Sequence, residues 1–194
     1  STKTIPSKKS LSAKSDNFLY KSNFDIYVGN GGKIQSISLL FDMMENLDKN
    51  CNLYIVEHNL QQQMLLEQAF RELLLTKLLK TLQKGHTVIL VHNTFNYTHN
   101  FDNFLCQYNK IKFHKNFHEY TDPLPEHYLL NSCYLLENYI CIKSNPFATD
   151  QTPLYTAIFK DLFTIEKSLC DIQHIIKIAT ARFKPVSSGQ KHTL

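Results

Sequence analysis

The sequence has no apolar run long enough to cross a bilayer, and its N-terminal residues do not resemble a signal peptide. Arginine is scarce: Arg71 and Arg182 are the only two, so the formal net charge of +4 rests on lysine. No predicted helix carries a basic stripe, which argues against direct binding of nucleic acid. These absences predict a cytoplasmic protein with no membrane partner and a solvated, lysine-rich surface.

Paired cysteines are also missing. The five cysteines are odd in number and widely spaced, and no C-x-x-C pair occurs among Cys51, Cys106, Cys133, Cys141 and Cys170. Such spacing is typical of reduced thiols in a cytoplasmic protein. Most of these side chains are therefore expected to fill the core.

Signatures of catalysis and of nucleotide binding are absent as well. The turn over residues 29–33 (GNGGK) lacks the G-K-[ST] of a P-loop. It also lacks G-x-G-x-x-G, because Ile34 stands where the third glycine would be. No G-x-S-x-G or H-E-x-x-H occurs either. We therefore expect no enzymatic activity, no cofactor and no metal.

The composition is that of a globular protein. With 43% hydrophobic residues, the 194-residue chain is long enough for one α/β domain with a sizeable core. Residues 1–16, rich in Ser and Lys, are predicted to be a flexible linker or tail, and residues 186–194 a flexible C-terminal tail. Residues 17–185 between them are predicted to form a single α/β domain.

Three short apolar runs organise this domain. They cover residues 25–28, 53–56 and 87–91, and each is followed by polar or glycine residues. Strands are therefore expected over residues 25–28, 52–57 and 87–92. Unbroken apolar runs of this length are typical of strands buried on both faces. The predicted fold class is α/β, with a mainly parallel central sheet and helices on both faces. A fourth strand is expected over residues 111–117.

Helical periodicity follows each of these runs. It predicts helices over about residues 32–47 and 60–83 and a weaker one over 97–108. Gly85 follows the last turn of the second helix and is a candidate for its C-cap. Helices that connect the strands in this way are consistent with parallel pairing.

The later part of the sequence has a different pattern. Residues 128–136 and 139–143 are β-rich and are separated by Glu137 and Asn138. A two-residue connection predicts a tight antiparallel hairpin at one side of the sheet, with positive φ at Asn138.

The last predicted element is a long C-terminal helical segment. Thr152 as N-cap and Pro153 at the first position predict a helix that ends near Phe183. Four apolar residues lie off its main row: Phe159, Phe163, Ile175 and Ile178. A second apolar strip needs another surface, so part of 154–183 is expected to form a two-fold homodimer interface. The alternative is two helices with a bend near 166–170, both packed on the same sheet.

The apolar runs also locate a candidate site. Ligands of open α/β sheets bind outside the carboxyl ends of the strands. The polar residues at those ends are the candidate ligand-binding residues: Asn30, Gly31, Gly32, Lys33, Glu57, His58, His92 and Asn93. A helix N-terminus beside Lys33 suits a small polar or anionic molecule. In the alternative, residues 29–33 are only a tight turn and the other residues only meet water.

A second polar cluster covers residues 114–119 (HKNFHE). On a helix, His114 and His118 would share a face like a His-x-x-x-His metal pair, but the surrounding residues favour a strand. The prediction for this cluster is a solvated loop. An alternative function is a phosphohydrolase or nucleotide-processing enzyme that uses His58 and His92, with His114 as a third candidate.

The order of these features resembles a known family. A strand ending in YVGNGGK is followed by a helix, an acidic strand end, a long helix ending in Lys-Gly and the strand TVILVHN. Over about residues 24–145 this order resembles the C-terminal effector domain of Gram-positive bacterial helix-turn-helix transcriptional regulators. The resemblance implies a non-catalytic ligand-sensing and dimerisation domain. It also implies that DNA is bound only through an upstream domain that is not present in this chain.

Such effector domains are similar to half of a phospholipase D-like fold, whose active motif is H-x-K-x4-D. Here His114 and Lys115 are adjacent, and no Asp follows at the required spacing. His86 and His92 lack a Lys two residues later. The resemblance therefore implies the fold without its catalysis. A second alternative function is a protein-interaction domain without a small ligand, in which the last helix is the interface.

Overall fold

The computed structural model describes residues 24–57, 60, 63–64, 67–92, 102–121, 132–146 and 153–182. Seven strands form one sheet in the order β1-β7-β6-β5-β2-β3-β4. The strands are β1 (Phe24–Val28), β2 (Asn52–Glu57), β3 (Thr87–His92), β4 (Phe117–Thr121), β5 (Ser132–Leu136), β6 (Ile140–Pro146) and β7 (Pro153–Phe159). The predicted tails, residues 1–16 and 186–194, lie outside the described residues.

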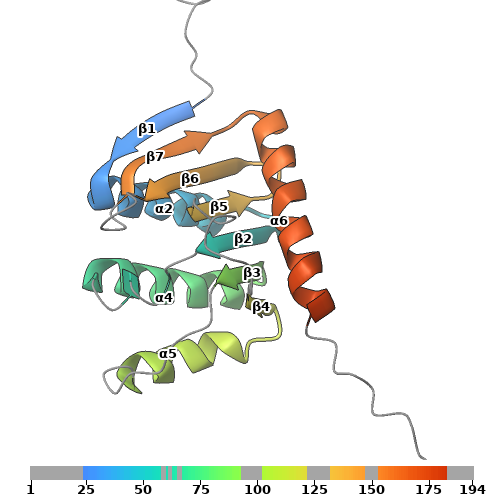
Figure 1. Cartoon of the computed structure of the whole chain (residues 1–194). Helices are drawn as coiled ribbons and strands as arrows, with labels where there is room; N and C mark the ends of the chain where they lie inside the picture. The colour runs from blue at the N-terminus through green and yellow to red at the C-terminus, as the bar shows by residue number, and fades with distance from the viewer. Residues whose placement is uncertain are drawn as a thin grey trace, which may run out of the picture.

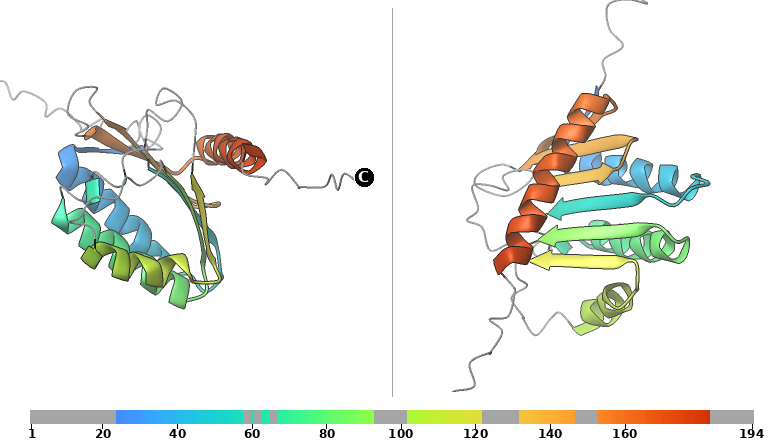
Figure 2. Two further views of the ribbon diagram at one scale, coloured as in Figure 1. Left: turned by 60° about the horizontal axis from the view of Figure 1, so that its bottom comes forward. Right: turned by 90° about the vertical axis from the view of Figure 1, so that its right-hand side faces the viewer.

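Helices cover both faces of the sheet, as expected. The labelled helices are α2 (Gly29–Glu45), α4 (Gln68–Gln83), α5 (Asp102–Lys112) and α6 (Leu162–Arg182). The first three lie on one face, and of the described helices α6 is the one that crosses the other face (Figures 1 and 2). Among the described helices, none is long and apolar enough to span a membrane.

The prediction of a mainly parallel sheet is wrong. β2–β3 and β3–β4 are parallel, whereas the other four neighbouring pairs are antiparallel. The strand at residues 25–28 lies at the sheet edge as β1, paired with β7. Its apolar run is not buried on both faces, because Ile26 is 59% and Val28 76% exposed. A short apolar run does not distinguish a central parallel strand from an edge strand.

The single helix predicted from Thr152 to Phe183 is also wrong. Residues 153–159 form β7, and α6 begins only at Leu162. Proline is tolerated at the first residue of a strand as well as of a helix, so Pro153 fits both. The real N-terminal cap is Asp161, whose Oδ1 accepts a hydrogen bond of 2.8 Å from the backbone N–H of Thr164.

Several boundaries differ from the prediction for local reasons. α4 begins at Gln68 rather than at residue 60, because Glu67 is extended, with φ −118° and ψ 94°. Leu60 and residues 63–64 are nonetheless helical. α5 continues to Lys112, so the fourth strand starts later than predicted, at Phe117. Gly85 follows α4 with φ +97°, which agrees with its predicted capping role.

The hairpin between β5 and β6 is present, but it occupies the middle of the sheet rather than one side. Its connection has three residues, Glu137 to Tyr139, because Leu136 pairs with Ile140. Asn138 adopts φ +67°, as predicted.

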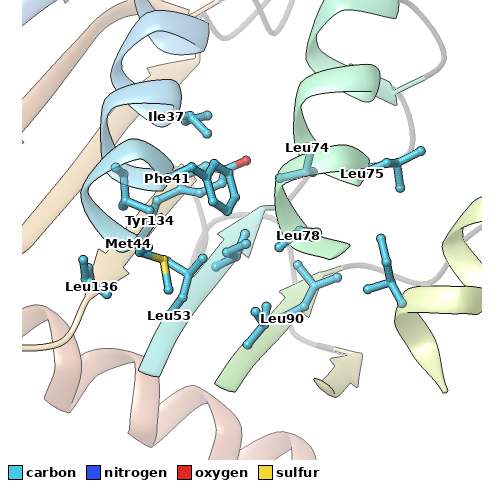
Figure 3. Close-up of a cluster of buried hydrophobic side chains, with 14 of the residues drawn as sticks. Ile37, Phe41, Met44, Leu53, Leu74, Leu75, Leu78, Leu90, Tyr134 and Leu136 are labelled. Carbon is cyan, nitrogen blue, oxygen red and sulfur yellow. The ribbon is translucent and has the colours of Figure 1, made fainter. Parts of the chain in front are cut away.

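The core lies mainly between the sheet and the layer of α2, α4 and α5. Figure 3 shows side chains of α2 and α4 that meet side chains of β2, β3 and β5. They include Ile37, Phe41, Met44, Leu53, Leu74, Leu75, Leu78, Leu90, Tyr134 and Leu136. A smaller cluster lies beneath α6 and includes Tyr54, Val56, Ile89, Val91, Cys133, Leu135, Cys141, Ile165 and Ile172.

Candidate functional site

The carboxyl ends of five strands, β1, β2, β3, β4 and β6, meet at one edge of the sheet. β2, β3 and β4 are parallel neighbours, so their carboxyl ends lie side by side. On the other side of β2, each neighbouring pair of strands is antiparallel. β5 and β7 therefore run opposite to β2, whereas β6 and β1 run in the same direction as β2. The start of α2 therefore lies at the same edge as the ends of β2 and β3.

A buried ion pair joins two of the predicted site residues at this edge. Nζ of Lys33, in the first turns of α2, lies 2.8 Å from Oε2 of Glu57, and the side chains are 4% and 2% exposed. Nζ also donates to Oε1 of Gln63 at 2.8 Å, and the Tyr134 hydroxyl donates to Oε2 of Glu57 at 2.9 Å. Nζ lies 5.3 Å from the centroid of the Phe70 ring. These partners compensate both charges, which a buried pair requires.

Close to this ion pair, a second carboxylate, Glu67, is hydrogen-bonded to the predicted site residue Asn30. Nδ2 of Asn30 donates to Oε1 of Glu67 at 2.5 Å. Burial raises the pKa of Glu67, the positive charge of Lys33 lowers it, and the negative charge of Glu57 raises it further. The pKa of Tyr134 is raised by burial and then by the negative charge of Glu57, so its hydroxyl remains a donor. The sequence did not point to Glu67, Gln63 or Tyr134.

The predicted turn over residues 29–33 belongs to α2 itself. Gly29, with φ +66°, is the one position there where positive φ is needed. Gly32 is needed for close approach, because a Cβ at this position would lie 2.8 Å from Cβ of Tyr27. Gly31 is exposed, and a Cβ there would meet nothing within 4 Å. The glycines thus allow α2 to start directly from β1 and bring Lys33 over the sheet.

A second charged cluster lies beside the first and contains His92. Oε1 of Glu119 lies 2.8 Å from Nε2 of His92 and accepts a 2.6 Å hydrogen bond from the Tyr108 hydroxyl. Nζ of Lys112 lies 3.1 Å from Oε2 of Glu119. Burial raises the pKa of Glu119, but the hydrogen bonds of His92 and Tyr108 and the positive charges outweigh it and hold the pKa at about 2. Burial, followed by the charge of Glu119, raises the pKa of Tyr108.

The histidines of the enzyme alternative do not all converge. His114 precedes β4 and lies at its amino end, whereas His92 ends the parallel strand β3. The two are therefore at opposite edges. The predicted loop over 114–119 is wrong from Phe117 onward, where β4 begins. His58 and Asn93 lie outside the described residues, and no three metal-ligating side chains gather within the described part of the chain.

Small hydroxyl side chains continue this polar edge across the antiparallel half of the sheet. Ser132 pairs with Ser144, and Ser144 with Thr156. The last residues paired between β2 and β5 are Val56 and Cys133, so Glu57 and Ser132 lie next to each other one position further on. On the other side of β2, Glu57 is paired with His92 of β3. All five side chains are buried. We call Thr156, Ser144, Ser132, Glu57 and His92 the polar row.

One member of the polar row lacks a partner. The Ser144 and Thr156 hydroxyl oxygens are 2.8 Å apart and hydrogen-bonded. Among the buried side chains that the structure describes, Oγ of Ser132 has no hydrogen-bond partner. The sequence did not reveal these three residues, because their alignment depends on β7 and on the register of the sheet. Their only sequence signal is a small polar residue beside an apolar run.

Comparisons with known proteins identify the fold but no family. The sequence matches no protein-family model and no curated protein. Among solved structures the chain is similar to TrmBL2, an archaeal chromatin protein whose structure shows a novel mode of DNA binding, with a TM-score of 0.50 and 10% identity. The match covers 80% of this chain and 52% of that chain, so this chain spans about half the length of TrmBL2. The fold is thus similar to that of TrmBL2. The comparison adds no support for the phospholipase D-like half fold.

Proposed function

We propose that this chain is the non-catalytic sensing and dimerisation part of a DNA-associated regulatory protein. In this proposal a small polar or anionic molecule binds at the polar row. The observation that carries it is the unpartnered hydroxyl of Ser132 beside the buried Lys33–Glu57 pair. An unsatisfied buried hydroxyl costs about 1–3 kcal/mol, which a polar group of a ligand recovers.

The DNA-associated part of the proposal is supported by the fold shared with TrmBL2 and by the resemblance to regulators. Direct contact between this chain and DNA is not proposed. The sequence holds two arginines, and arginine is the residue that most often reads base edges. We infer that DNA is contacted through a domain outside this chain.

Ligand binding can be tested with simple probes. Inorganic phosphate and succinate are titrated into the protein, and the melting temperature is followed. We expect at least one of them to raise it, because a ligand that binds the folded state stabilises that state. Ser132→Ala should remove more than half of the shift, whereas Lys77→Ala, which changes an exposed ion pair, should leave it intact. No shift with either probe, or equal shifts in all three proteins, would refute the proposal.

We propose that the protein dimerises through the exposed apolar residues within 154–183, the segment predicted to form the interface. Leu162 is 61% and Phe163 76% exposed at the start of α6. Phe159, Ile175 and Ile178 are half-buried. We expect sedimentation at high micromolar concentration to show a dimer that Phe163→Asp converts to monomer. Phe113→Asp, at a position that is 82% exposed in the turn after α5, is the matched control and should remain dimeric. A monomeric native protein would contradict this assignment.

One observation favours the enzyme alternative. The contact between His92 and Glu119 has the geometry of a histidine oriented by a carboxylate, as in general acid–base sites. Our proposal expects phosphodiester hydrolysis no faster than background. Turnover of bis(4-nitrophenyl) phosphate that disappears in His92→Ala would establish the enzyme alternative instead.

A further inference from the structure

Two cysteine thiols touch on the sheet face beneath α6. Cys133 of β5 and Cys141 of β6 lie on neighbouring antiparallel strands, and their Sγ atoms are 3.7 Å apart. The strand register pairs Cys133 with Lys143 and Leu135 with Cys141, so the two cysteines are diagonal neighbours on one face. Both are free thiols, and their exposures are 8% and 0%.

The two sulfur atoms are not equivalent. The hydrogen bond with Cys133 lowers the pKa of the Cys141 thiol, burial raises it, and a hydrogen bond with Ser168 of α6 lowers it. The same hydrogen bond, followed by burial, raises the pKa of Cys133. The contact allows either thiol to donate, and the lowered pKa of Cys141 makes its thiol the one that ionises more readily.

We propose that Cys133 and Cys141 form a reversible disulfide and that this oxidation requires α6 to separate from the sheet. Diagonal neighbours whose sulfur atoms are already in contact need only side-chain rotation and a small strand movement to reach the bonding distance of about 2.05 Å. The closed helix excludes any reagent from Cys141, since Ile165, Ser168 and Ile172 of α6 are buried against this face. The oxidation state of the two cysteines thus depends on whether α6 has separated from the sheet.

The reaction is an exchange with a low-molecular-weight disulfide such as oxidised glutathione. The Cys141 thiolate attacks one sulfur of the reagent, a mixed disulfide forms, and one glutathione thiolate leaves. Cys133 then attacks the Cys141 sulfur, its proton passes to the second departing glutathione, and the protein disulfide forms. Two protein thiols are oxidised and one reagent disulfide is reduced to two thiols.

The test uses the full chain with Cys51, Cys106 and Cys170 changed to serine, so that only the pair remains. The protein is equilibrated in glutathione redox buffer, quenched, alkylated in denaturant and weighed by mass spectrometry. We expect a product that has lost two hydrogen atoms and takes up no alkylating agent. Its equilibrium with glutathione should favour the disulfide about tenfold or more over that of the same chain in urea, because the fold holds the thiols together.

Two outcomes would overturn the proposal. One is full alkylation of both cysteines across the redox range, and the other is a disulfide no more favoured in the folded chain than in urea. Cys133→Ala serves as the control for the order of attack and should stop at a glutathione adduct on Cys141. The involvement of α6 is tested by Ile172→Ala, which loosens the helix and should speed oxidation. An unchanged rate would refute that part.

Discussion

The two faces of the sheet are built from alternate residues of the same strands, yet they bury different chemistry. The face under α2, α4 and α5 carries the larger apolar cluster and, at the carboxyl edge, the ion pair of Lys33 with Glu57 and the contact of His92 with Glu119. The face under α6 carries a smaller cluster of apolar and sulfur-containing side chains. The two faces also differ in the helices that cover them: α2, α4 and α5 lie over the first face, whereas α6 crosses the second (Figure 2).

The difference shows what a buried charge needs. Glu57 and Lys33 are compensated by side chains from α2, from β5 and from the segment before α4. Glu119 is held by side chains from β3 and α5. A single crossing helix offers one row of side chains, whereas a helical layer surrounds a charge from several directions. The layered face can therefore hold the candidate site, and the α6 face can hold thiols.

The largest expected effect comes from removing one partner of the buried ion pair. Glu57→Leu leaves the Lys33 ammonium without its carboxylate and should lower the free energy of unfolding by about 3–5 kcal/mol. Glu45→Ala, which breaks an exposed pair with Lys77, should cost under about 1 kcal/mol. Urea denaturation measures both. Equal losses in the two variants would mean that buried charge is not what distinguishes the face under α2, α4 and α5 from the face under α6.

A recovery experiment sharpens this prediction. The double variant Lys33→Met with Glu57→Leu removes both charges, so it should regain most of the stability that Glu57→Leu alone loses. A double variant less stable than either single variant would show that the site depends on packing around these residues rather than on charge compensation.

Matched isoleucine truncations compare the apolar parts of the two faces. Ile37 on α2 is 0% exposed and Ile172 on α6 is 3% exposed. Ile37→Ala should cost about 4 kcal/mol, because two helices and the sheet hold the cavity open. Ile172→Ala should cost about 2 kcal/mol, since a helix that packs only against the sheet relaxes more easily and is loosened rather than left with a rigid cavity. Thermal or urea unfolding gives both values, and equal losses would mean that α6 is held as rigidly as the helical layer.

The smallest expected effect is the acid sensitivity of the second charged cluster. The pKa of Glu119 is held at about 2 in the folded state, below its ordinary value of 4.5. Its stabilising contribution is therefore present above pH 4.5 and is lost as the pH falls toward 2. We expect it to amount to about 2 kcal/mol, allowing for its partial exposure.

The measurement is the free energy of unfolding at about pH 5 and about pH 3. Native protein should lose more stability between these values than Glu119→Gln, whose side chain does not titrate. Tyr108→Phe should show an intermediate loss, because one hydrogen bond to the carboxylate is removed. Equal losses in native protein and Glu119→Gln would place the acid-sensitive group elsewhere in the chain.

Elements with a strong local signal were predicted most accurately. The bounds of β2 and β3 agree with the prediction, because both strands are buried between two layers and read as continuous apolar runs. β1 and β7 were misread for the opposite reason. β1 pairs with β7, which is far from it in the sequence, and Phe24 lies opposite Phe159. Neither segment by itself indicates that the other is its partner strand. Pro153 suits the start of a strand or of a helix, so only the pairing decides between them.

The sequence by itself determined that polar residues end the strands at 52–57 and 87–92 and that Lys33 follows a glycine-rich strand end. The tertiary structure decided which of these residues meet: Lys33 with Glu57, and His92 with Glu119. It also aligned Ser132 with Glu57 and brought Cys133 against Cys141. The physical reason is that polarity and periodicity are local properties of a segment. Strand order and register depend on pairing between segments that are distant in the chain.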